Sequence, residues 1–472
     1  MEFNSIEFLS FLAFLFFLLW GLKDHAKVYN VILLIASYTF YGLWDYRFLF
    51  LIFASSVVDF VIGYYIPQSK YKKLLITTSL ALNLGLLMFF KYFNFFIETT
   101  NDFLQALGFE NSYHTLSIIL PVGISFYTFQ TLSYSLDIYK GKIKPTKDFL
   151  VFLNFVSFFP QLVAGPIERA ARFLPQFTEK KKFNIEEATI GMRLLLYGLF
   201  KKIVIADNAA IRIDPVFANP EGYTSTELSL AAFYFSIQLY TDFSAYTDIA
   251  RGVGKLLGFR LMENFKNPLF SQSVPEFWSR WHISLTTWFR DYLFIWLAGL
   301  NRKSTVWRII ATIILFVVIG FWHGANYTFI VFGFLNGLYF IPKILSGNYK
   351  WLRDSLNYIK QHTVWGYVII VANLGLLTLT GIIFRSATLS SAGLYFERLF
   401  FASSYTSSTF MVEFLPAGLA FLAFEWVMRK KSHPFDISSF HPMFRRSLYV
   451  LLIITTLLYG YFGTEPFYYF QF

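Results

Sequence analysis

The sequence contains no cysteine in its 472 residues. This absence excludes structural disulfides, a thiol nucleophile, an S-acyl enzyme intermediate and any metal site built from thiolates. Acyl chemistry, if there is any, must therefore use other side chains. Charged residues are also scarce, because they make up 15% of the chain, against about 25% in an average soluble domain. The composition points to a membrane protein.

Apolar residues take the place of the missing charge, with 56% hydrophobic residues and 60 phenylalanines. A hydrocarbon core about 30 Å thick needs roughly 20 apolar residues per helix. Apolar runs lie at residues 8–22, 28–44, 48–66, 74–97, 116–138, 187–206, 229–250, 306–322, 327–344, 364–384, 412–428 and 447–463. They predict an all-α, polytopic integral membrane protein with about 11–12 transmembrane helices, formed by residues 1–472 as a single domain.

The first apolar run is interpreted as a retained membrane span rather than a secretory signal. Its leader, MEFNS, has no basic residue, and no small-residue cleavage site follows the run. A signal peptide would have both a basic leader and a small-residue cleavage site.

The net charge of +11 does not indicate nucleic-acid binding. Lysine and arginine lie in the loops between apolar runs rather than along one continuous face. Such loops orient a membrane protein and meet lipid headgroups, so the basic ones are expected at the cytoplasmic side. The acidic loop ETTNDFLQALGFENSYH suits the opposite side. Alternation of the predicted spans then places both termini outside.

Residues 150–166 form an apolar segment that does not fit this alternation. Lysine-rich sequence lies on both sides of it, and Pro160 and the Gly165–Pro166 pair interrupt any helix. Broken backbone at membrane depth is tolerated only beside protein or a water-filled cavity. We therefore expect a re-entrant segment, with a tilted full span kinked at proline as the alternative.

The region 251–300 is expected to be cytoplasmic, with an amphipathic helix at the inner leaflet or dipping into it as a re-entrant element. Ser273 precedes Glu276 by three residues, a capping-box arrangement, and Pro275 falls in the expected first turn. Helical spacing then predicts that one apolar face continues past His282. That face contains Phe277, Trp281, Leu285, Trp288 and Tyr292.

Two of the seven histidines are candidates for chemistry. His282 lies on the predicted amphipathic helix, and His323 ends an apolar span, where Gly320 and Gly324 are expected to leave open space around its ring. An imidazole in an apolar pocket stays neutral and can act as a base. An ordinary structural or interfacial role is the alternative for both. The remaining histidines lie in polar loops and are expected to be solvated: His25, His114, His362, His433 and His441.

Acidic residues within predicted spans must pair, line water or take up a proton, because unpaired ionisation there is costly. They are Asp59, Asp137, Asp242, Asp248 and Glu425. Asp248 lies one turn before Arg251, which predicts an ion pair. Structural hydrogen bonding is the favoured interpretation of Asp242 and Asp248.

Four motifs resemble the membrane-bound O-acyltransferases, specifically the bacterial branch that includes alginate O-acetylase. They are FPQLVAGPIERAARFLPQF, QLYTDFSAYTDIARGVGKLLGFRLMENFKNP, EFWSRWHISLTTWFRDYLF and GFWHGANYTFIVFGFLNGLY. The resemblance extends over roughly residues 5–470 and is strongest over 121–339. It implies helices around a central tunnel, a multi-pass location in the bacterial inner membrane, and His323 and His282 as catalytic residues.

The resemblance also implies the substrates and partners. Acetyl-CoA would be the cytoplasmic acyl donor, with no bound cofactor and no metal. An exported, alginate-like polysaccharide would receive the acetyl group through an extracytoplasmic polysaccharide-modifying protein. The two histidines would face a shared tunnel from its two mouths. No nucleic acid is expected as a partner, and the lipid bilayer surrounds the chain.

Further residues are expected to bind substrate. Arg280, Arg290 and Lys255 could meet the phosphates of CoA, while Asn326 and the indole of Trp322 are candidate donors to the developing oxyanion. For Trp322 the alternative is a packing aromatic.

Other activities stay open at this point. Within the family the alternatives are peptidoglycan or cellulose O-acetylation and D-alanyl transfer to teichoic acid. In another class, the chain is a transporter with Asp59, Asp242 and Glu425 along its pathway.

Overall fold

The computed structural model describes residues 1, 3–109, 113–162, 165–361, 363–401, 409–463 and 467. Regular structure in these residues is helical, without any strand, which confirms the all-α prediction. Six helical stretches of the described chain are long and apolar enough to cross a bilayer: Ala26–Tyr65, Lys72–Ala106, Thr305–His323, Tyr327–Leu345, Thr363–Arg385 and Thr409–Met428. The chain is a multi-pass membrane protein.

The larger number of 11–12 spans stays a prediction. The apolar runs at 28–44 and 48–66 belong to one helical stretch, Ala26–Tyr65, and the first run forms a shorter apolar helix, Ile6–Gly21. The helices of the chain fall into two compact units that alternate along the sequence. Each unit is described separately.

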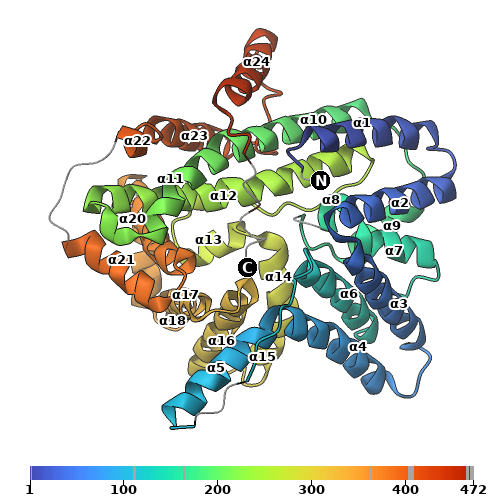
Figure 1. Cartoon of the computed structure of the whole chain (residues 1–472), viewed down its shortest axis with the longest axis horizontal. Helices are drawn as coiled ribbons and strands as arrows, with labels where there is room; N and C mark the ends of the chain where they lie inside the picture. The colour runs from blue at the N-terminus through green and yellow to red at the C-terminus, as the bar shows by residue number, and fades with distance from the viewer. Residues whose placement is uncertain are drawn as a thin grey trace. The chain divides into compact units, whose positions relative to one another are not determined.

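The first unit comprises residues Met1–Leu195 and Tyr246–Met262. In it α3 and α4 both pack against α6, while α7 packs against α2, α3 and α9 (Figure 1). Its elements are α1 (Ile6–Gly21), α2 (Ala26–Asp45), η1 (Tyr46–Phe48), α3 (Leu49–Tyr65), α4 (Lys72–Leu87), η2 (Met88–Tyr92), α5 (Phe93–Ala106), α6 (Ile124–Tyr139), α7 (Phe149–Ser157), α8 (Phe159–Leu162), α9 (Ala170–Thr178), most of α10 (Ile185–Phe200) and the end of α12 (Ser225–Leu256).

Asp59 shows how the first unit accommodates an acid inside a span. The residue is fully buried, and its carboxylate accepts hydrogen bonds from Ser79 Oγ at 2.6 Å, Asn83 Nδ2 at 2.7 Å and Ser135 Oγ at 2.9 Å. These donors come from α4 and α6. The carboxylate therefore joins three helices through hydrogen bonds, as expected for a polar group that lipid cannot solvate.

The predicted re-entrant segment is broken into short helices. The helix α7 ends at Ser157 and α8 covers only Phe159–Leu162, with Pro160 inside α8. Residues 151–162 are all buried. A nine-residue helix is about 14 Å long, too short to cross a bilayer, so the described part is not one continuous span. Its depth in the membrane stays a prediction.

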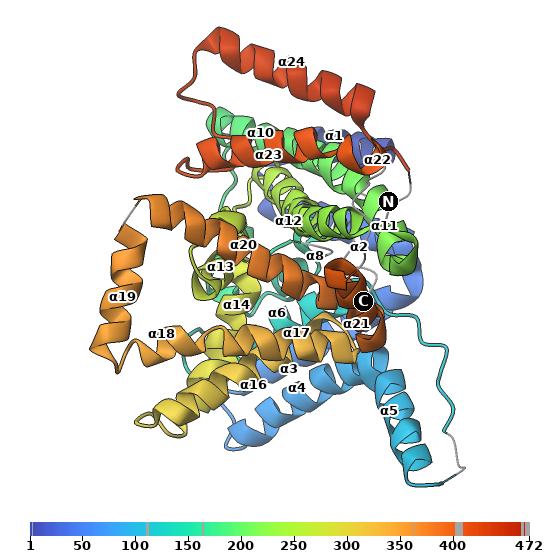
Figure 2. The ribbon, with the colours of Figure 1, turned by 90° about the vertical axis from the view of Figure 1, so that its left-hand side faces the viewer.

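The second unit comprises residues Leu196–Ala245 and Glu263–Phe472. Here α16, α17 and α20 lie side by side (Figure 2). Its further elements are η3 (Lys201–Ala206), α11 (Asp207–Ala218), η4 (Pro220–Gly222), the start of α12, η5 (Pro268–Phe270), α13 (Val274–Arg280), α14 (Ile283–Phe289), η6 (Arg290–Phe294), α15 (Ile295–Gly299), α16 (Thr305–His323), α17 (Tyr327–Leu338), α18 (Ile341–Leu345), α19 (Lys350–Gln361), α20 (Thr363–Arg385), α21 (Leu389–Phe401), α22 (Thr409–Val412), α23 (Leu415–Met428) and α24 (Pro442–Tyr459).

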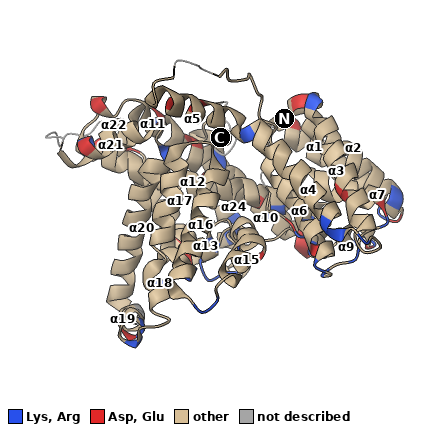
Figure 3. Ribbon diagram, turned by 90° about the horizontal axis from the view of Figure 1, so that it is seen from below, with Lys and Arg blue, Asp and Glu red and all other residues tan. Residues whose placement is uncertain are grey.

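Charge follows the expected pattern along α19 and α20. Figure 3 shows basic and acidic residues on α19, whereas α20 is uncharged until its last residue, Arg385. An apolar helix of 23 residues is long enough to span the hydrocarbon core.

Glycines allow α16 and α17 to pack closely. A Cβ atom on Gly320 would lie 2.1 Å from the carbonyl oxygen of Phe329, and one on Gly333 would lie 2.2 Å from that of Phe316. At Gly324 a Cβ would meet the Phe329 ring at 2.1 Å. The expectation that Gly320 and Gly324 leave open space beside His323 is wrong, because neighbouring backbone and ring atoms fill that space.

Replacing Gly320 with Ala should destabilise the protein by about 1–3 kcal/mol, the usual cost of overpacking. The added methyl group would push α17 away from α16. Thermal unfolding in detergent measures the effect, and Gly375→Ala is the matched control. Gly375 lies within α20 with no atom near its Cβ position, so its replacement should leave the unfolding temperature unchanged or slightly higher. Equal stability of the two variants would contradict the close packing.

The predicted continuous amphipathic helix through His282 is wrong. The helix α13 ends at Arg280 and α14 starts at Ile283, because Trp281 is extended and His282 adopts left-handed φ and ψ angles of 42° and 52°. The N-terminal signals of α13 are confirmed: the Glu276 N–H donates to Ser273 Oγ, and Pro275 lies in the first turn. The break turns Trp281 and His282 away from a common helical face, and both are buried.

Candidate active site

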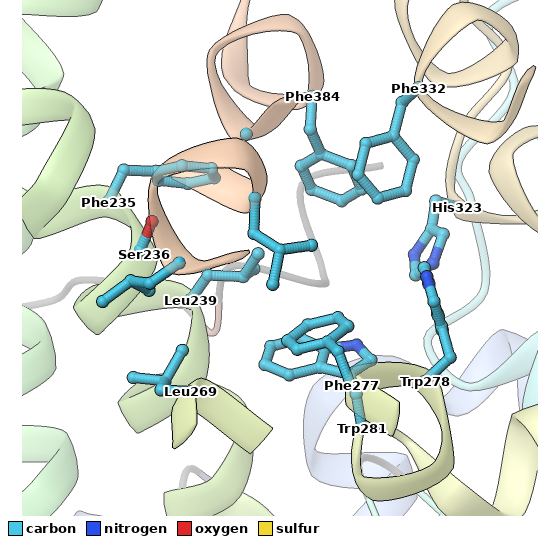
Figure 4. Close-up of a pocket in the computed structure, with 13 residues that line it drawn as sticks. Phe235, Ser236, Leu239, Leu269, Phe277, Trp278, Trp281, His323, Phe332 and Phe384 are labelled. Atoms are coloured by element: carbon cyan, nitrogen blue, oxygen red, sulfur yellow. The ribbon is translucent and has the colours of Figure 1, made fainter. Parts of the chain in front are cut away.

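His323 lies in the wall of a small apolar cavity in the second unit. The residue ends α16, and only 2% of it is exposed. The cavity has a volume of about 50 Å³. Figure 4 shows His323 on one side, Phe332 and Phe384 above, and Trp281 and Phe277 below. Its lining comprises Phe235, Ser236, Leu239, Leu269, Phe277, Trp278, Trp281, His323, Phe332, Leu374, Leu377, Gly381 and Phe384.

Aromatic rings hold the imidazole of His323 in place. The Phe384 ring meets it edge-on at a centroid distance of 5.3 Å, and the Trp322 ring lies at 5.0 Å. Phe384 comes from α20, so it is tertiary packing that brings α20 onto the end of α16. Such packing restricts the rotamers of a side chain and fixes its orientation towards the cavity.

His282 caps the N-terminus of α14. Its left-handed backbone turns the imidazole towards the helix, and Nδ1 accepts a hydrogen bond from the backbone N–H of Leu285 at 3.3 Å. Because Nδ1 accepts, the neutral ring carries its proton on Nε2. The residue is fully buried, and this burial lowers the pKa of His282 to about 3. The ring is therefore neutral at physiological pH.

Trp322 connects the two histidines. Its ring centroid lies 5.8 Å from that of His282 and 5.0 Å from that of His323. One indole thus separates the two imidazoles, a distance far shorter than the hydrocarbon thickness of about 30 Å. The two histidines are therefore neighbours across one indole, although they belong to different helices. That they face a shared tunnel stays a prediction.

The three predicted phosphate-binding cations have acidic partners. Arg280 pairs with Glu276 at 2.6 Å and Arg290 with Asp291 at 2.9 Å. Both belong to the second unit and have partly exposed side chains. Lys255 belongs to the first unit, where it pairs with Glu187.

The two predicted oxyanion donors have other contacts. The Asn326 side chain accepts from the Thr328 N–H at 3.0 Å and donates to the Ala387 carbonyl at 2.8 Å, so its amide caps α17 and ties it to the segment after α20. Trp322 packs between the two histidine rings and is not among the described residues that line the cavity. Packing is the role that the geometry of Trp322 supports.

The sequence reasoning missed Trp278 and Trp281 as cavity residues. It placed the Trp281 side chain on one face of a continuous helix, because helical spacing was the pattern it followed. The density of large aromatics in FWSRWH is the signal that points to a buried segment, since so much aromatic area is seldom left in water.

Three of the acids in predicted spans have polar or charged partners. Glu425 is fully buried and accepts hydrogen bonds from Tyr197, Tyr240 and Asn267 at 2.6–2.7 Å. Asp242 pairs with Lys202 at 3.0 Å. In the first unit Asp248 pairs with Arg251 at 3.2 Å, as predicted. These contacts support structural roles for the acids.

The other histidines are mostly solvated. His25, His114 and His441 are exposed, as expected. His433 is 7% exposed, so the expectation of a solvated ring is wrong there, because the loop after α23 folds back onto the second unit. His362 lies outside the described residues.

Within the described chain, no group of three or more histidine or acidic side chains is arranged to hold a metal ion. The cavity side chains that carry polar atoms are Ser236, Trp278, Trp281 and His323. Of these, His323 alone has the chemistry of a general base.

Comparison with known proteins gives consistent matches. The family model of the membrane-bound O-acyltransferases matches residues 146–355, which include His282 and His323. The chain is similar to the probable alginate O-acetylase of Pseudomonas syringae pv. tomato, with 37% identity over 407 residues, 85% of this chain and 75% of the relative.

The chain is also similar to transferases whose names give other acceptors. The peptidoglycan O-acetyltransferase of Helicobacter pylori is 36% identical over 335 residues, 65% of this chain and 62% of the relative. The teichoic acid D-alanyltransferase of Bacillus subtilis is 30% identical over 257 residues, 51% of this chain and 64% of the relative.

Proposed function

Since the chain belongs to the membrane-bound O-acyltransferase family and is an O-acyltransferase, we propose that it transfers acetyl groups from cytoplasmic acetyl-CoA for O-acetylation of an exported, alginate-like polysaccharide. The observation that carries this proposal is the buried His323 in the wall of an apolar cavity. A general base beside a space for an acyl group is the minimum arrangement for hydroxyl activation.

The proposed reaction uses His323 as the base. A neutral imidazole takes the proton of the acceptor hydroxyl while the hydroxyl oxygen attacks the thioester carbonyl. The carbon–sulfur bond then breaks, and the imidazolium returns the proton to the leaving CoA thiolate. A positioned general base contributes roughly 10²- to 10⁴-fold to such a step.

The cavity favours acetyl over larger or charged acyl groups. Its volume of about 50 Å³ is small, which suits a two-carbon acyl group. A D-alanyl group would bring an ammonium among phenylalanine, leucine and tryptophan side chains, and burying an unpaired cation is costly. The size and apolar lining therefore support acetyl transfer rather than D-alanyl transfer.

The remaining parts of the proposal concern location and partners. The chain lies in the bacterial inner membrane, where acetyl-CoA is available from the cytoplasm. Arg280 and Arg290, both partly exposed, can exchange their carboxylate partners for CoA phosphates. An extracytoplasmic polysaccharide-modifying protein completes the transfer, because the polymer is outside the membrane.

Two measurements test this function. Purified protein in lipid nanodiscs should release CoA from acetyl-CoA when an acceptor sugar is present, whereas a transporter would leave the thioester intact. Mass analysis of glycans from cells with and without the protein should show loss of acetyl groups from an exported polysaccharide. If acetyl groups are lost from peptidoglycan instead, the acceptor is peptidoglycan and not an exported polysaccharide. If the purified protein does not cleave acetyl-CoA, the proposal is overturned.

A further inference from the structure

Apart from the His323 ring, the cavity lining offers three side chains with polar hydrogens, and the indole N–H of Trp281 is the one without a protein acceptor in the described chain. Ser236 shares a hydrogen bond of 2.9 Å with Thr378, and Trp278 donates to Asn336 Oδ1 at 2.9 Å. The backbone N–H of Trp281 donates to the Phe277 carbonyl, but its indole N–H has no hydrogen-bond partner among the described residues, although only 4% of Trp281 is exposed. Buried indoles normally donate. Its N–H is therefore available to a molecule in the cavity.

The surroundings of Trp281 hold its indole rigidly. Phe277 stacks on it with ring centroids 5.3 Å apart and an interplanar angle of 19°, while Phe265 meets it edge-on at 5.0 Å. The break between α13 and α14 turns this residue into the cavity wall (Figure 4). A fixed donor needs little reorganisation during a reaction, and this is the property that makes such a group effective in electrostatic catalysis.

We propose that Trp281 is a catalytic residue whose indole N–H donates to the carbonyl oxygen of the acyl group in the cavity. This inference rests on the proposed acetyl transfer and adds the group that receives the negative charge. Asn326 does not take this role, since its amide is engaged by Thr328 and Ala387. His323 and Trp281 line the same cavity, one as base and the other as donor.

The electron balance of the step is simple. As the acceptor oxygen attacks, the carbonyl π electrons move to the carbonyl oxygen, which becomes an oxyanion and accepts the Trp281 hydrogen bond. When the oxyanion collapses, the carbonyl re-forms and the carbon–sulfur bond electrons leave with CoA. Trp281 gives up no proton. Removal of one oxyanion donor typically lowers kcat by about 10²- to 10³-fold.

The test replaces the donor while keeping an aromatic ring. Trp281→Phe in nanodiscs should lower kcat for acetyl transfer by about 100-fold, with the KM for acetyl-CoA within a few-fold of the wild-type value. Trp426→Phe is the matched control. The carbonyl oxygen of Trp426 accepts from Arg429, but its indole N–H likewise has no hydrogen-bond partner among the described residues. Trp426 is absent from the cavity lining, so its replacement should leave kcat unchanged.

A second variant separates donation from packing. Replacing Trp281 with 3-benzothienylalanine keeps the bicyclic shape and substitutes sulfur for the N–H group, so it should lose as much activity as Trp281→Phe. Wild-type kcat in the benzothienyl variant would overturn the inference and leave the proposed function intact. If the wild-type protein itself shows no acetyl-CoA turnover, the proposed function fails first, before any variant is compared.

Discussion

Replacing His323 with Ala should reduce kcat for acetyl transfer by at least about 10²-fold, because the acceptor hydroxyl loses its base. His323→Gln should be similarly inactive, since an amide fills part of the ring's volume but does not take a proton. Thioester cleavage and sugar acetylation are measured on purified variants with matched amounts of folded protein. The imidazole lies in the wall of an apolar cavity, and only 2% of His323 is exposed.

His114→Ala is the control for this experiment. His114 is exposed in the first unit, and its loss should leave acetyl transfer at the wild-type rate. Wild-type kcat in His323→Ala would rule out the imidazole as the base and would leave the cavity as a feature of packing.

His282 should show two separable effects. His282→Ala loses the Nδ1 cap of α14 and the ring packed on Trp322, so we expect lower stability, by about 1 kcal/mol or more from the cap alone. His282→Asn should retain the fold, because asparagine caps helices and tolerates left-handed backbone angles. Both variants should lose about 10-fold or more in kcat. Without the His282 imidazole, the Trp322 indole that packs against His323 loses one of its supporting rings.

The comparison of the two variants decides the role of His282. Thermal unfolding in detergent measures stability, and CoA release measures activity. If His282→Asn works at the wild-type rate, the ring serves only as a helix cap. A large loss of activity with preserved stability would instead make His282 a positioning residue.

The pH dependence of stability gives an independent readout. The pKa of His282 is lowered by burial to about 3, below the unfolded value of about 6.5. As pH falls from about 6.5 towards 3, the unfolded chain binds a proton that the folded chain excludes. Stability should decrease over that window by about 1.4 kcal/mol per pH unit. His282→Asn lacks this titration, so its stability should fall less steeply in acid.

The local features that the sequence predicted depend on neighbouring residues. Apolar runs predicted helices, and the structure has α16 ending at His323, where the run ends. The capping signals of Ser273 and Glu276 and the pairing of Asp248 with Arg251 are also confirmed. In each case the interacting groups lie within four residues, so spacing along the chain is enough to bring them together.

The same reasoning failed where a local pattern competed with tertiary packing. Helical spacing predicted that one helix passes through His282, but the backbone breaks there and the aromatic side chains are buried. Gly320 and Gly324 were expected to leave open space around the His323 ring, yet both glycines lie in close contact with α17. Spacing does not reveal which element packs against a residue, and packing decides both outcomes.

The sequence by itself determined that this chain is helical and membrane-spanning, and its motifs pointed to His282 and His323. Composition and apolar run length were sufficient for the first conclusion, because lipid accepts only backbone whose hydrogen bonds are satisfied internally. The tertiary structure alone decided that one indole joins the two histidines and that Trp281 lines the cavity of His323. Those contacts join residues from α12, α13, α16, α17 and α20, and only packing between distant helices can bring such residues together.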